Sequence, residues 1–284
     1  MLPPDVILRA AREALAEDLA WGDLTSSAFA PAGVRARLSV RFRAEAVACG
    51  LPVAEAVFAR AAPGAAWSAR AADGDRLAAG QVAAVIEGEA RALLTGERVA
   101  LNFLQRLSGV ATLTAAFVAA ARQGSPTCRI ADTRKTTPGL RALEKYAVRT
   151  GGGVNHRFGL ADGVLVKDNH LAVLARAGVS LAEAVAAARA RIPHTCRIEV
   201  EVEDLAQARA ALEAGADILL LDNMSEEEMR AAVALARGRA LTEASGNMSL
   251  ERVPAVAATG VDLISVGALT HSAPAVDIGL DFEA

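Results

Sequence analysis

The segment from residue 132 to residue 157, DTRKTTPGLRALEKYAVRTGGGVNHR, gathers side chains that bind anions. It contains six Arg and Lys residues against two acids, whereas the whole chain of 284 residues has a formal net charge of −3. Such an excess of positive charge in an acidic protein indicates either a solvated basic face or a site for a small anionic ligand. Broad nucleic-acid binding is not indicated, because it needs many phosphate contacts.

Polar residues recur at the C-terminal ends of six apolar, β-rich segments in the second half of the chain. The segments are TCRIAD (127–132), GVLVKD (163–168), CRIEVEV (196–202), ADILLLD (216–222), ALTEAS (240–245) and VDLISVG (261–267). Their polar endings are Asp132-Thr-Arg-Lys, Lys167-Asp-Asn-His, Glu199-Val-Glu201, Asp222-Asn, Glu243-Ala-Ser-Gly and Gly267. Because the carboxyl ends of the strands of a β/α barrel meet at one face, we expect these residues to surround one pocket. This pattern favours the ligand site over the solvated face.

Helical segments separate the later strands. They include DLAQARAALEAG, SEEEMRAAVALARG and SLERVPAVAATG, each of which ends in glycine, and the second and third open with Ser as an N-cap. Apolar strands that alternate with amphipathic helices predict a parallel sheet covered by helices. We therefore predict an α/β fold with an incomplete parallel β/α barrel as the catalytic domain, over residues 109–271.

The first 108 residues have a different pattern. VRARLSVRFRAEAVACG alternates apolar and polar residues, and AWSARAADGDRLAAGQVAAVIEGEA indicates short strands around a DG turn. The stretch GERVALNFLQRLSGVATLTAAFVAAARQG predicts a long amphipathic helix with a break near Ser108 and Gly109. We predict an N-terminal α+β domain over residues 1–108, with the tail at 272–284 as a candidate to pack on it.

The remaining composition bears on the cellular compartment. Cys49, Cys128 and Cys196 are far apart and form no CxxC pair, so we expect small core residues in a reducing compartment. The N-terminus carries acids and lacks an apolar core, so we expect no signal peptide. No run approaches ~18 apolar residues, so we expect no membrane span. These features predict a cytoplasmic protein.

The predicted pocket carries both signs of charge. Its candidates for binding carboxylates or phosphates are Arg134, Lys135, His156, Arg157 and Lys167. Glu201 and Asp222 instead suit a hard divalent cation such as Mg²⁺, held in part through water, or sugar hydroxyls. Anion-binding cations beside a Mg²⁺ site imply a polyanionic substrate such as a pyrophosphate.

Two glycine-containing regions are typical of close ligand approach. The segment at 245–247 (SGN) precedes a helix expected to begin near Ser249, and Gly267 ends the last strand. Barrels often bind a phosphate at their last two strands, with backbone N–H groups and a helix N-terminus. The three glycines at 151–153 stand just before a histidine and an arginine, and we expect them to frame a ligand.

These motifs resemble those of the quinolinate phosphoribosyltransferase family. The resemblance rests on DTRKTTPGLRALEKYAVRTGGGVNHR, GVLVKDNH, EVEVEDL, LLLDNM, EASGNMSLE and TGVDLISVGALTHSAPAVDIGLD, and in the first half on LAEDLAWGDLTS and LLTGERVALNFLQRLSG. It implies an incomplete α/β barrel with an N-terminal α+β sandwich domain. It also implies that quinolinate and phosphoribosyl pyrophosphate (PRPP) react, with Mg²⁺, to nicotinate mononucleotide, pyrophosphate and CO₂ in de novo NAD biosynthesis.

The resemblance also implies how the residues are used. Four residues would hold the carboxylates of quinolinate, namely Arg134, His156, Arg157 and Lys167. Three catalytic residues are implied: Lys135 would face PRPP, and Glu201 and Asp222 would bind its ribose hydroxyls and Mg²⁺. The family is a homodimer in which one subunit's N-terminal domain covers the other's pocket, so Arg98 would reach in from the partner subunit. Whether such dimers assemble further into a hexamer of dimers is left open by the resemblance.

The 5′-phosphate of PRPP is assigned, by the same resemblance, to the last two strand ends. Its residues would be Ser245, Gly246 and Gly267, with His271 nearby. The other implied substrate-binding residues are Thr133, Asn247, Val266 and Ala268. Many members of the family have a second glycine where this chain has Asn247.

Three other functions stay open at this point. The first is another type II phosphoribosyltransferase, such as one that acts on nicotinate without decarboxylation, or the related protein encoded with molybdate transporters; the full set of cations favours a dicarboxylate instead. The second is a non-catalytic regulator that binds PRPP or an NAD precursor, against which Glu201 and Asp222 argue. The third is an unrelated barrel aldolase with Lys167 as Schiff base, against which the neighbouring Asp168 argues. Whether a general acid or base takes part is also open.

Overall fold

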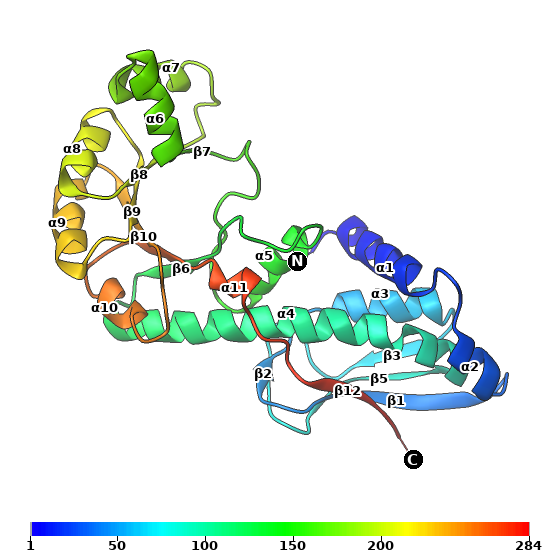
Figure 1. The fold of residues 1–284 in the computed structure, drawn as a ribbon. Helices are drawn as coiled ribbons and strands as arrows, with labels where there is room; N and C mark the ends of the chain where they lie inside the picture. The colour runs from blue at the N-terminus through cyan, green and yellow to red at the C-terminus, as the bar shows by residue number, and fades with distance from the viewer. Residues whose placement is uncertain (1, 284) are drawn as a thin grey trace. The chain divides into compact units, whose positions relative to one another are not determined.

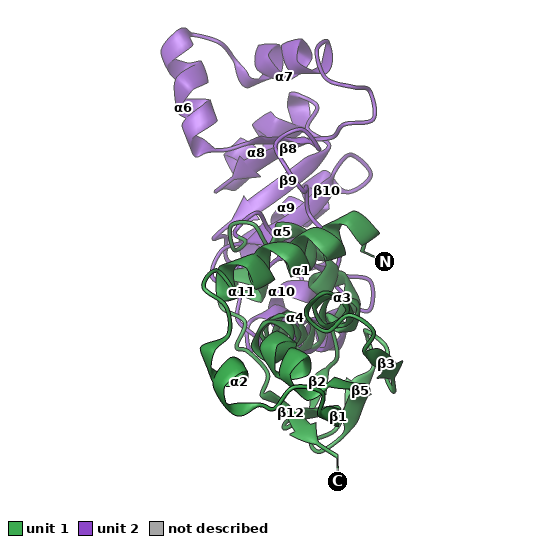
Figure 2. Ribbon diagram, turned by 90° about the vertical axis from the view of Figure 1, so that its right-hand side faces the viewer, with its two compact units in different colours: residues 1–115, 136–152, 268–284 green, residues 116–135, 153–267 purple. Residues whose placement is uncertain are grey.

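A computed structural model describes residues 2–283, which fall into two compact units shown in green and purple in Figure 2. Unit 1 comprises the residues up to 115, residues 136–152 and the residues from 268 onward, and unit 2 comprises residues 116–135 and 153–267. The domain boundary predicted between residues 108 and 109 lies inside helix α4 (Ala90–Gly124). Residues 116–124 of this helix belong to unit 2.

Unit 1 contains an antiparallel sheet with the strand order β12-β1-β5-β3. Its strands are β1 (Arg35–Phe42), β3 (Ala66–Ala69), β5 (Val82–Glu89) and β12 (Ile278–Phe282). On β1 the side chains of Leu38, Val40 and Phe42 are buried, as the alternating sequence predicts for a strand with one core face. The C-terminal strand β12 pairs with β1, so the tail of the chain completes this sheet.

Unit 1 also contains several helices, which give it its α+β character. They are α1 (Pro4–Asp18), α2 (Leu24–Phe29), α3 (Leu51–Ala61), the first part of α4, α5 (Arg141–Thr150) and α11 (Ala268–His271), and a two-stranded ribbon joins β2 (Ala46–Val47) to β4 (Arg76–Leu77). The core between sheet and helices contains Val57, Phe58, Leu93 and Leu104, all almost fully buried. Burial of these apolar surfaces is the main contribution to the stability of the unit.

Helix α4 runs for 35 residues without the break predicted near Ser108 and Gly109. Both residues serve close packing instead. The Ser108 hydroxyl accepts from the Cys49 backbone N–H (3.0 Å) and donates to the Cys49 carbonyl oxygen (3.2 Å). A Cβ atom at Gly109 would lie 2.0 Å from the Pro274 carbonyl oxygen, so only glycine lets the tail pass the helix here.

Helix α4 is also long and apolar enough, by length and composition, to cross a membrane. The sequence analysis expected no such segment. However, 56% of its most apolar window is buried inside the protein, and a buried core helix has the same composition. The apolar composition of this window therefore reflects the position of α4 in the protein core.

Unit 2 contains a parallel sheet of six strands in the order β6-β11-β10-β9-β8-β7. The strands are β6 (Arg129–Ala131), β7 (Val164–Val166), β8 (Ile198–Val202), β9 (Ile218–Asp222), β10 (Leu241–Ser245) and β11 (Leu263–Ser265), which confirms all six predicted strands. The two edge strands, β6 and β7, do not pair with each other, so within the described residues the barrel is incomplete, as predicted.

Helices cover the outside of this sheet, as Figure 1 shows for its yellow and orange part. They are α6 (Asp168–Ala177), α7 (Leu181–Arg189), α8 (Leu205–Glu213), α9 (Glu226–Ala236) and α10 (Val253–Ala257). Ser225 caps α9 as predicted, since its side chain accepts from the Glu228 N–H while Glu228 bonds back to Ser225.

Helix α10 is the exception to the predicted pattern. We expected it to begin near Ser249, but it begins at Val253. The reason is Pro254, whose ring would clash with the carbonyl group of Leu250 if it lay in the interior of a longer helix. Residues 249–252 form a turn that leads directly into α10, in which the Val253 N–H donates to the Ser249 carbonyl oxygen (3.0 Å).

The packing of Gly109 predicts that Gly109→Ala destabilises the protein. The added methyl group would overlap the Pro274 carbonyl, and relief of such overpacking typically costs about 1–3 kcal/mol. Urea unfolding should show a lower midpoint with an unchanged slope. Gly159→Ala is the matched control, because its Cβ would meet nothing within 4 Å. Equal stability of the two variants would contradict the packing account.

Candidate active site

The carboxyl ends of the strands in unit 2 open into a cavity of about 270 Å³. It is lined by Thr133, Arg134, Lys135, His156, Arg157, Leu165, Lys167, Leu220, Glu243, Ser245 and Ser265. Seven of these are residues that the sequence analysis proposed for substrate binding. Segments up to 132 positions apart in the chain, from residue 133 to residue 265, therefore line one cavity.

The register of the parallel sheet explains why these side chains share a face. Glu201 of β8 and Glu243 of β10 are both paired with Leu220 of β9, and Ser245 is paired with Asp222. Side chains two positions apart on a strand point to the same face. Leu220 and Asp222 therefore lie on one face of the sheet together with their partners on both neighbouring strands.

Repulsion between cations marks the cavity as an anion site. The Nε atom of Arg134 is buried and has no hydrogen-bond partner among the described residues. Burial, and then the charge of Arg134, lower the pKa of the Arg157 guanidinium. An anionic ligand would accept a hydrogen bond from the Arg134 Nε atom and reduce the repulsion between the guanidinium groups of Arg134 and Arg157.

The loop that carries His156 is tied down by a fully buried carboxylate. Asp132 accepts the His156 backbone N–H (2.8 Å) and the Asn155 side-chain amide (2.6 Å). The His156 Nδ1 atom accepts the Arg157 backbone N–H (2.7 Å), which places the ring proton on Nε2. This Nε2–H donates to Glu199 (3.0 Å). Both ring nitrogens are therefore engaged in hydrogen bonds within the protein, whereas the sequence predicted the ring as an anion-binding group.

His156, Glu199 and Glu243 together have the donor set of a metal site, since their ligand atoms lie within 4.8 Å of one another. A metal on Nε2 would require the ring to lose its proton while Nδ1 still accepts an N–H. That state is an imidazolate, which is far less favourable than a neutral ring. We therefore assign the cluster to proton and hydrogen-bond chemistry.

Glu243 is the most perturbed acid of this cluster. Burial, followed by the neighbouring charge of Glu199, raises the pKa of Glu243 from 4.5 to about 7, while His156 acts in the opposite direction. Its Oε1 atom and the Oε1 atom of Glu199 are buried without a hydrogen-bond partner in the part of the chain that the structure describes. Two adjacent carboxylates in a buried position cannot both ionise without a large cost.

Glu201 and Asp222, the residues predicted for Mg²⁺, follow each other at the ends of adjacent strands. Glu201 accepts a charged hydrogen bond from the Lys167 ammonium group (2.8 Å), and Asp222 accepts one from the Asn223 amide (2.8 Å). Two carboxylates suit Mg²⁺, which keeps several waters and takes further oxygens from substrate phosphates. The donor set therefore fits the ion, which Glu201 and Asp222 would hold.

The loop after β10 has the backbone geometry of a close-approach site. Gly246 has a φ of +93°, and a Cβ atom there would lie 2.2 Å from the Asn223 side-chain oxygen. Asn247 also has a positive φ, +48°, and its side-chain amide donates to the same oxygen (3.1 Å). Asparagine tolerates this conformation better than other side chains, which explains how it can replace glycine here. The phosphate-binding helix N-terminus expected at Ser249 is absent, because α10 begins later.

The remaining predicted site residues lie at the end of unit 2 or in unit 1. Val266 is buried, and its N–H donates to the Ala131 carbonyl oxygen (2.9 Å); Gly267 follows it at the end of unit 2. Arg98, Ala268 and His271 belong to unit 1, where Arg98 is exposed on α4 and His271 ends the short helix α11.

The glycines at 151–153 have a packing function. A Cβ atom at Gly151 would lie 2.3 Å from the Ala111 carbonyl oxygen of α4, and Gly152 has a φ of +90° directly after α5. The first glycine lets two helices approach and the second turns the chain. The expectation that they frame a ligand is replaced by these two backbone requirements.

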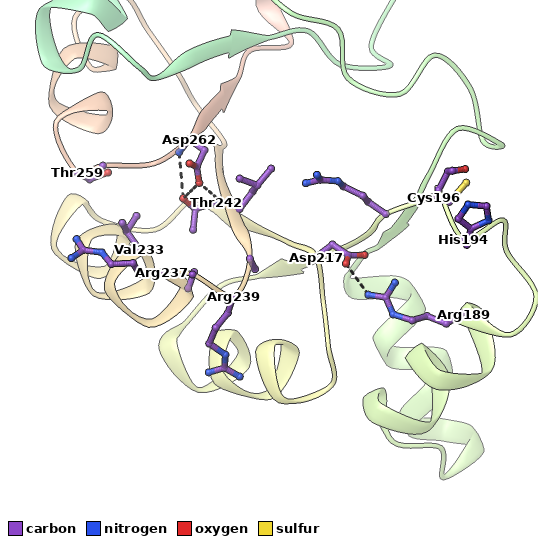
Figure 3. Close-up of a pocket in the computed structure, with 17 residues that line it drawn as sticks. Arg189, His194, Cys196, Asp217, Val233, Arg237, Arg239, Thr242, Thr259 and Asp262 are labelled. Carbon is purple, nitrogen blue, oxygen red and sulfur yellow. Dashed lines mark hydrogen bonds and ion pairs between the residues drawn. The ribbon is translucent and has the colours of Figure 1, made fainter.

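A larger hollow of about 790 Å³ lies at the opposite, amino ends of the strands (Figure 3). Asp217, just before β9, accepts from Arg189 (2.9 Å) and from the Ile198 N–H (2.7 Å). Asp262, just before β11, accepts from the Thr242 N–H (2.8 Å). Figure 3 shows Arg189 directed at Asp217, and Asp262 beside Thr242. These acids join neighbouring strands, and barrel enzymes carry their chemistry at the carboxyl ends, so we assign this hollow no catalytic function.

Three residues of the site had no function predicted from the sequence: Asp132, Glu199 and Glu243. They were visible as acids at the ends of apolar strands, but the pattern could not show which of them are buried. A signal was present in EVEVE, because a carboxylate at position 199, inside an apolar strand, must find a partner.

A parallel β/α barrel with cations and acids at the carboxyl ends of its strands defines an enzyme for a small anionic substrate. Comparison with known proteins agrees. Residues 110–281 match the quinolinate phosphoribosyl transferase C-terminal domain, and residues 23–108 match the N-terminal domain of the same family. The chain belongs to the quinolinate phosphoribosyl transferase family.

Individual relatives support this membership along almost the whole chain. The nicotinate-nucleotide pyrophosphorylase [carboxylating] of Mycobacterium leprae is 45% identical over 276 residues, 95% of this chain and 95% of the relative. A probable enzyme of the same name from Bacillus subtilis is 44% identical over 93% of this chain and 89% of the relative. The solved nicotinate-nucleotide pyrophosphorylase of Francisella tularensis superposes with a TM-score of 0.93 at 39% identity, covering 100% of this chain and 98% of that one.

The geometry of the loop after β10 predicts opposite results for two substitutions. Gly246→Ala should shift the loop, since the methyl group would overlap Asn223 and the positive φ is strained, and we expect a loss of about 1–3 kcal/mol. Asn247→Gly keeps the backbone conformation accessible and should change stability by less than about 1 kcal/mol. Thermal and urea unfolding of both variants would measure this. A stable Gly246→Ala protein with unchanged PRPP affinity would contradict the assigned loop geometry.

Proposed function

We propose that the protein transfers the phosphoribosyl group of PRPP to quinolinate with loss of CO₂, giving nicotinate mononucleotide and pyrophosphate, as a step of NAD biosynthesis. The observation that carries this proposal is the cavity lined by Arg134, Lys135, Arg157 and Lys167. In it the Nε atom of Arg134 is buried without a hydrogen-bond partner among the described residues. Membership of the quinolinate phosphoribosyl transferase family supports the identity of the anion.

The two carboxylates of quinolinate are matched by three of these cations. Arg134 and Arg157 can each bind a carboxylate with two parallel N–H donors, and Lys167 adds a point charge. His156 lines the same cavity, with its ring bonded to Glu199 and to the Arg157 backbone N–H. In this proposal its contribution is to position the loop that carries Arg157, and Thr133 adds a hydroxyl.

The glycosyl transfer needs stabilisation of opposite charges on either side of the ribose. Its transition state has oxocarbenium character, which Glu201 and Asp222 would stabilise through their negative charge. The same two residues would hold Mg²⁺, which when bound supplies charge neutralisation for the departing pyrophosphate. Lys135 lines the cavity and would bind the phosphates of PRPP from the other side. The 5′-phosphate would lie on the backbone of the loop containing Ser245, Gly246 and Asn247 and on the strand end with Val266, Gly267 and Ala268, with His271 nearby.

Loss of CO₂ follows from the alkylation of the pyridine nitrogen. Once this nitrogen is bonded to ribose, the positive ring stabilises the electron pair that the breaking C–CO₂⁻ bond leaves on the ring carbon, and this carbon then takes up a proton from water. The cavity must therefore hold a dianion before the reaction and release one carboxylate as a neutral molecule afterwards. Fixed cations at the other carboxylate keep the ring in place during this step.

We further propose a homodimer in which Arg98 completes the partner's site. Unit 1 exposes large apolar side chains near its N-terminus, with Trp21 96%, Leu24 83% and Phe29 85% exposed. Exposed apolar residues this close together are typical of an interface. A second copy of the chain is the occupant that the family resemblance implies, and a larger assembly of dimers is compatible with it.

We place the reaction in the cytoplasm. All three cysteines are free, and Cys49 and Cys128 are buried small core residues, as expected for a reducing compartment. Neither a membrane nor a nucleic acid is proposed as a partner.

One alternative function loses its support on geometric grounds. An aldolase would need Lys167 as an unprotonated nucleophile, which requires a desolvated lysine without an anionic partner. Lys167 is 48% exposed and forms a 2.8 Å ion pair with Glu201. An exposed lysine with an anionic partner does not meet this requirement, so a Schiff base at this position is disfavoured.

The proposed binding mode predicts a selective effect of Arg134→Ala. We expect quinolinate to bind about 10- to 100-fold more weakly, because a charge-assisted contact contributes about 1.5–3 kcal/mol. PRPP binding should change much less. Isothermal titration of each substrate would measure both effects, with Arg230→Ala on the exposed side of α9 as the control. An equal loss for both substrates would contradict the assignment.

The proposed dimer predicts that two inactive variants restore activity when mixed. Arg98→Ala and Lys135→Ala should each be inactive, whereas a mixed dimer has one site with both native residues. Random exchange of subunits should then give about a quarter of the native activity. Mixed dimers that form, as shown by mass spectrometry, and yet remain inactive would contradict a shared site.

A further inference from the structure

Glu243 lines the same cavity as the anion-binding cations, although it has the same sign of charge as the substrate. It lies on β10, where its side chain is 4% exposed, and its position next to Leu220 on β9 directs it to the inner face of the sheet. An ionised carboxylate here would repel a dianion. The family's cation set does not explain why an acid lies in this place.

The hydrogen bonds of the cluster leave one buried oxygen of Glu243 without a donor in the described part of the chain. His156 has one N–H, on Nε2, and this donates to Glu199 at 3.0 Å. The Oε1 atom of Glu243 lies 3.7 Å from the same nitrogen, which is beyond hydrogen-bond range, and it is buried without a partner. Ser265 is the only side-chain hydrogen-bond donor that acts on Glu243, and it leaves the Oε1 atom unpaired within the described residues. A buried carboxylate oxygen with no donor is strongly disfavoured, whereas a carboxylic acid at this position brings its own donor.

The surroundings of Glu243 contain acids close by and cations around the cavity. Besides burial, Glu199 on β8 and then Asp132 at the end of β6 raise the pKa of Glu243, whereas His156 and a hydrogen bond from Ser265 lower it. The groups that face the cavity from the other elements are Arg134, Lys135, Arg157, Lys167 and Ser265.

We propose that Glu243 is a further substrate-binding residue, which acts as a neutral carboxylic acid and donates a hydrogen bond to the anionic dicarboxylate in the cavity. The proposal rests on the function proposed above, because it takes quinolinate as the ligand. In this arrangement the cations supply charge and Glu243 supplies one uncharged donor. Binding of the dianion therefore requires the proton on Glu243, and the complex holds that proton more tightly than the free protein does.

The linkage between the proton and the ligand fixes the direction of the pH dependence. Since burial raises the pKa of Glu243 to about 7, the free protein carries the proton below this pH and loses it above. The affinity for quinolinate should be constant on the acid side. Above about pH 7 it should fall about tenfold for each pH unit, with uptake of up to one proton per ligand bound.

The experiment is isothermal titration of quinolinate into the full-length protein from about pH 6 to about pH 9, where quinolinate stays a dianion. Repeating each titration in buffers of different ionisation enthalpy counts the protons taken up. Glu243→Gln keeps the shape and an uncharged donor, so it should bind quinolinate without pH dependence and without proton uptake. Glu227→Gln, an exposed acid of α9, is the control and should behave as the native protein.

Two outcomes would overturn the proposal while the proposed function stands. One is native protein that binds quinolinate with no proton uptake and no loss of affinity above pH 7. The other is a pH dependence that persists in Glu243→Gln, which would assign the titration to His156 or another group. Failure of the native protein to bind quinolinate at any pH would instead overturn the proposed function, and this proposal with it.

A second measurement does not need the ligand and covers the case in which Glu243→Gln folds poorly. The pKa of Glu243 is raised in the folded state from 4.5 to about 7, so the native protein keeps a proton that the unfolded chain releases between these values. The stability due to this group is therefore full below about pH 4.5 and is lost as the pH rises through about 7. The unfolding equilibrium constant should rise by on the order of a hundredfold over this range through Glu243 alone. Carbon-13 NMR of the glutamate carboxyl groups should show one that titrates near pH 7, and its absence would contradict the proposal.

Discussion

Repulsion between like charges in one small cavity is the constraint on which the rest of unit 2 depends. Arg134, Lys135, Arg157 and Lys167 line a cavity of about 270 Å³, and part of Arg134 is buried there without a hydrogen-bond partner. Such a group of cations is held together only because the surrounding scaffold is rigid and supplies negative charge. Their electrostatic energy is lowered further when an anion binds, which is how the fold provides affinity for a dicarboxylate.

The surrounding structure offsets the repulsion between these cations with acidic side chains at fixed positions. Asp132 fixes the loop that carries His156 and Arg157, Glu199 anchors the imidazole, and Glu201 pairs with Lys167. All of them are placed by the parallel register of the sheet, which aligns the ends of neighbouring strands. Glu243 lies beside Glu199 and has a buried oxygen without a hydrogen-bond partner in the described residues, and this arrangement is what suggests that it carries a proton.

The sequence predicted the barrel well, because its signals are periodic and local. Six apolar strands with polar ends and the Ser225 cap needed no knowledge of tertiary contacts. The errors arose where distant contacts decide. Gly109 looked like a break in α4 until its contact with Pro274 was known, and Gly151 looked like part of a ligand site until its contact with Ala111 was known. Pro254 could have corrected the start of α10 from the sequence alone, since its ring excludes a helix that begins at Ser249.

The candidate site was predictable by residue type and less so by ionisation state. Charge and spacing identify Arg134, Arg157 and Lys167 as anion-binding residues. They cannot show that His156 has its Nδ1 atom on the Arg157 N–H, nor that Glu199 and Glu243 lie side by side in the interior. These facts depend on side-chain directions at 3 Å precision, which only the folded arrangement determines.

The measurement that tests the account most directly follows both products of one reaction. Purified protein is mixed with quinolinate, PRPP and Mg²⁺, and nicotinate mononucleotide and CO₂ are measured together over time. We expect both to appear in equal amounts and only when all three components are present. If neither forms, while nicotinate or another base is ribosylated under the same conditions, the assignment of the cation cluster to a dicarboxylate is wrong.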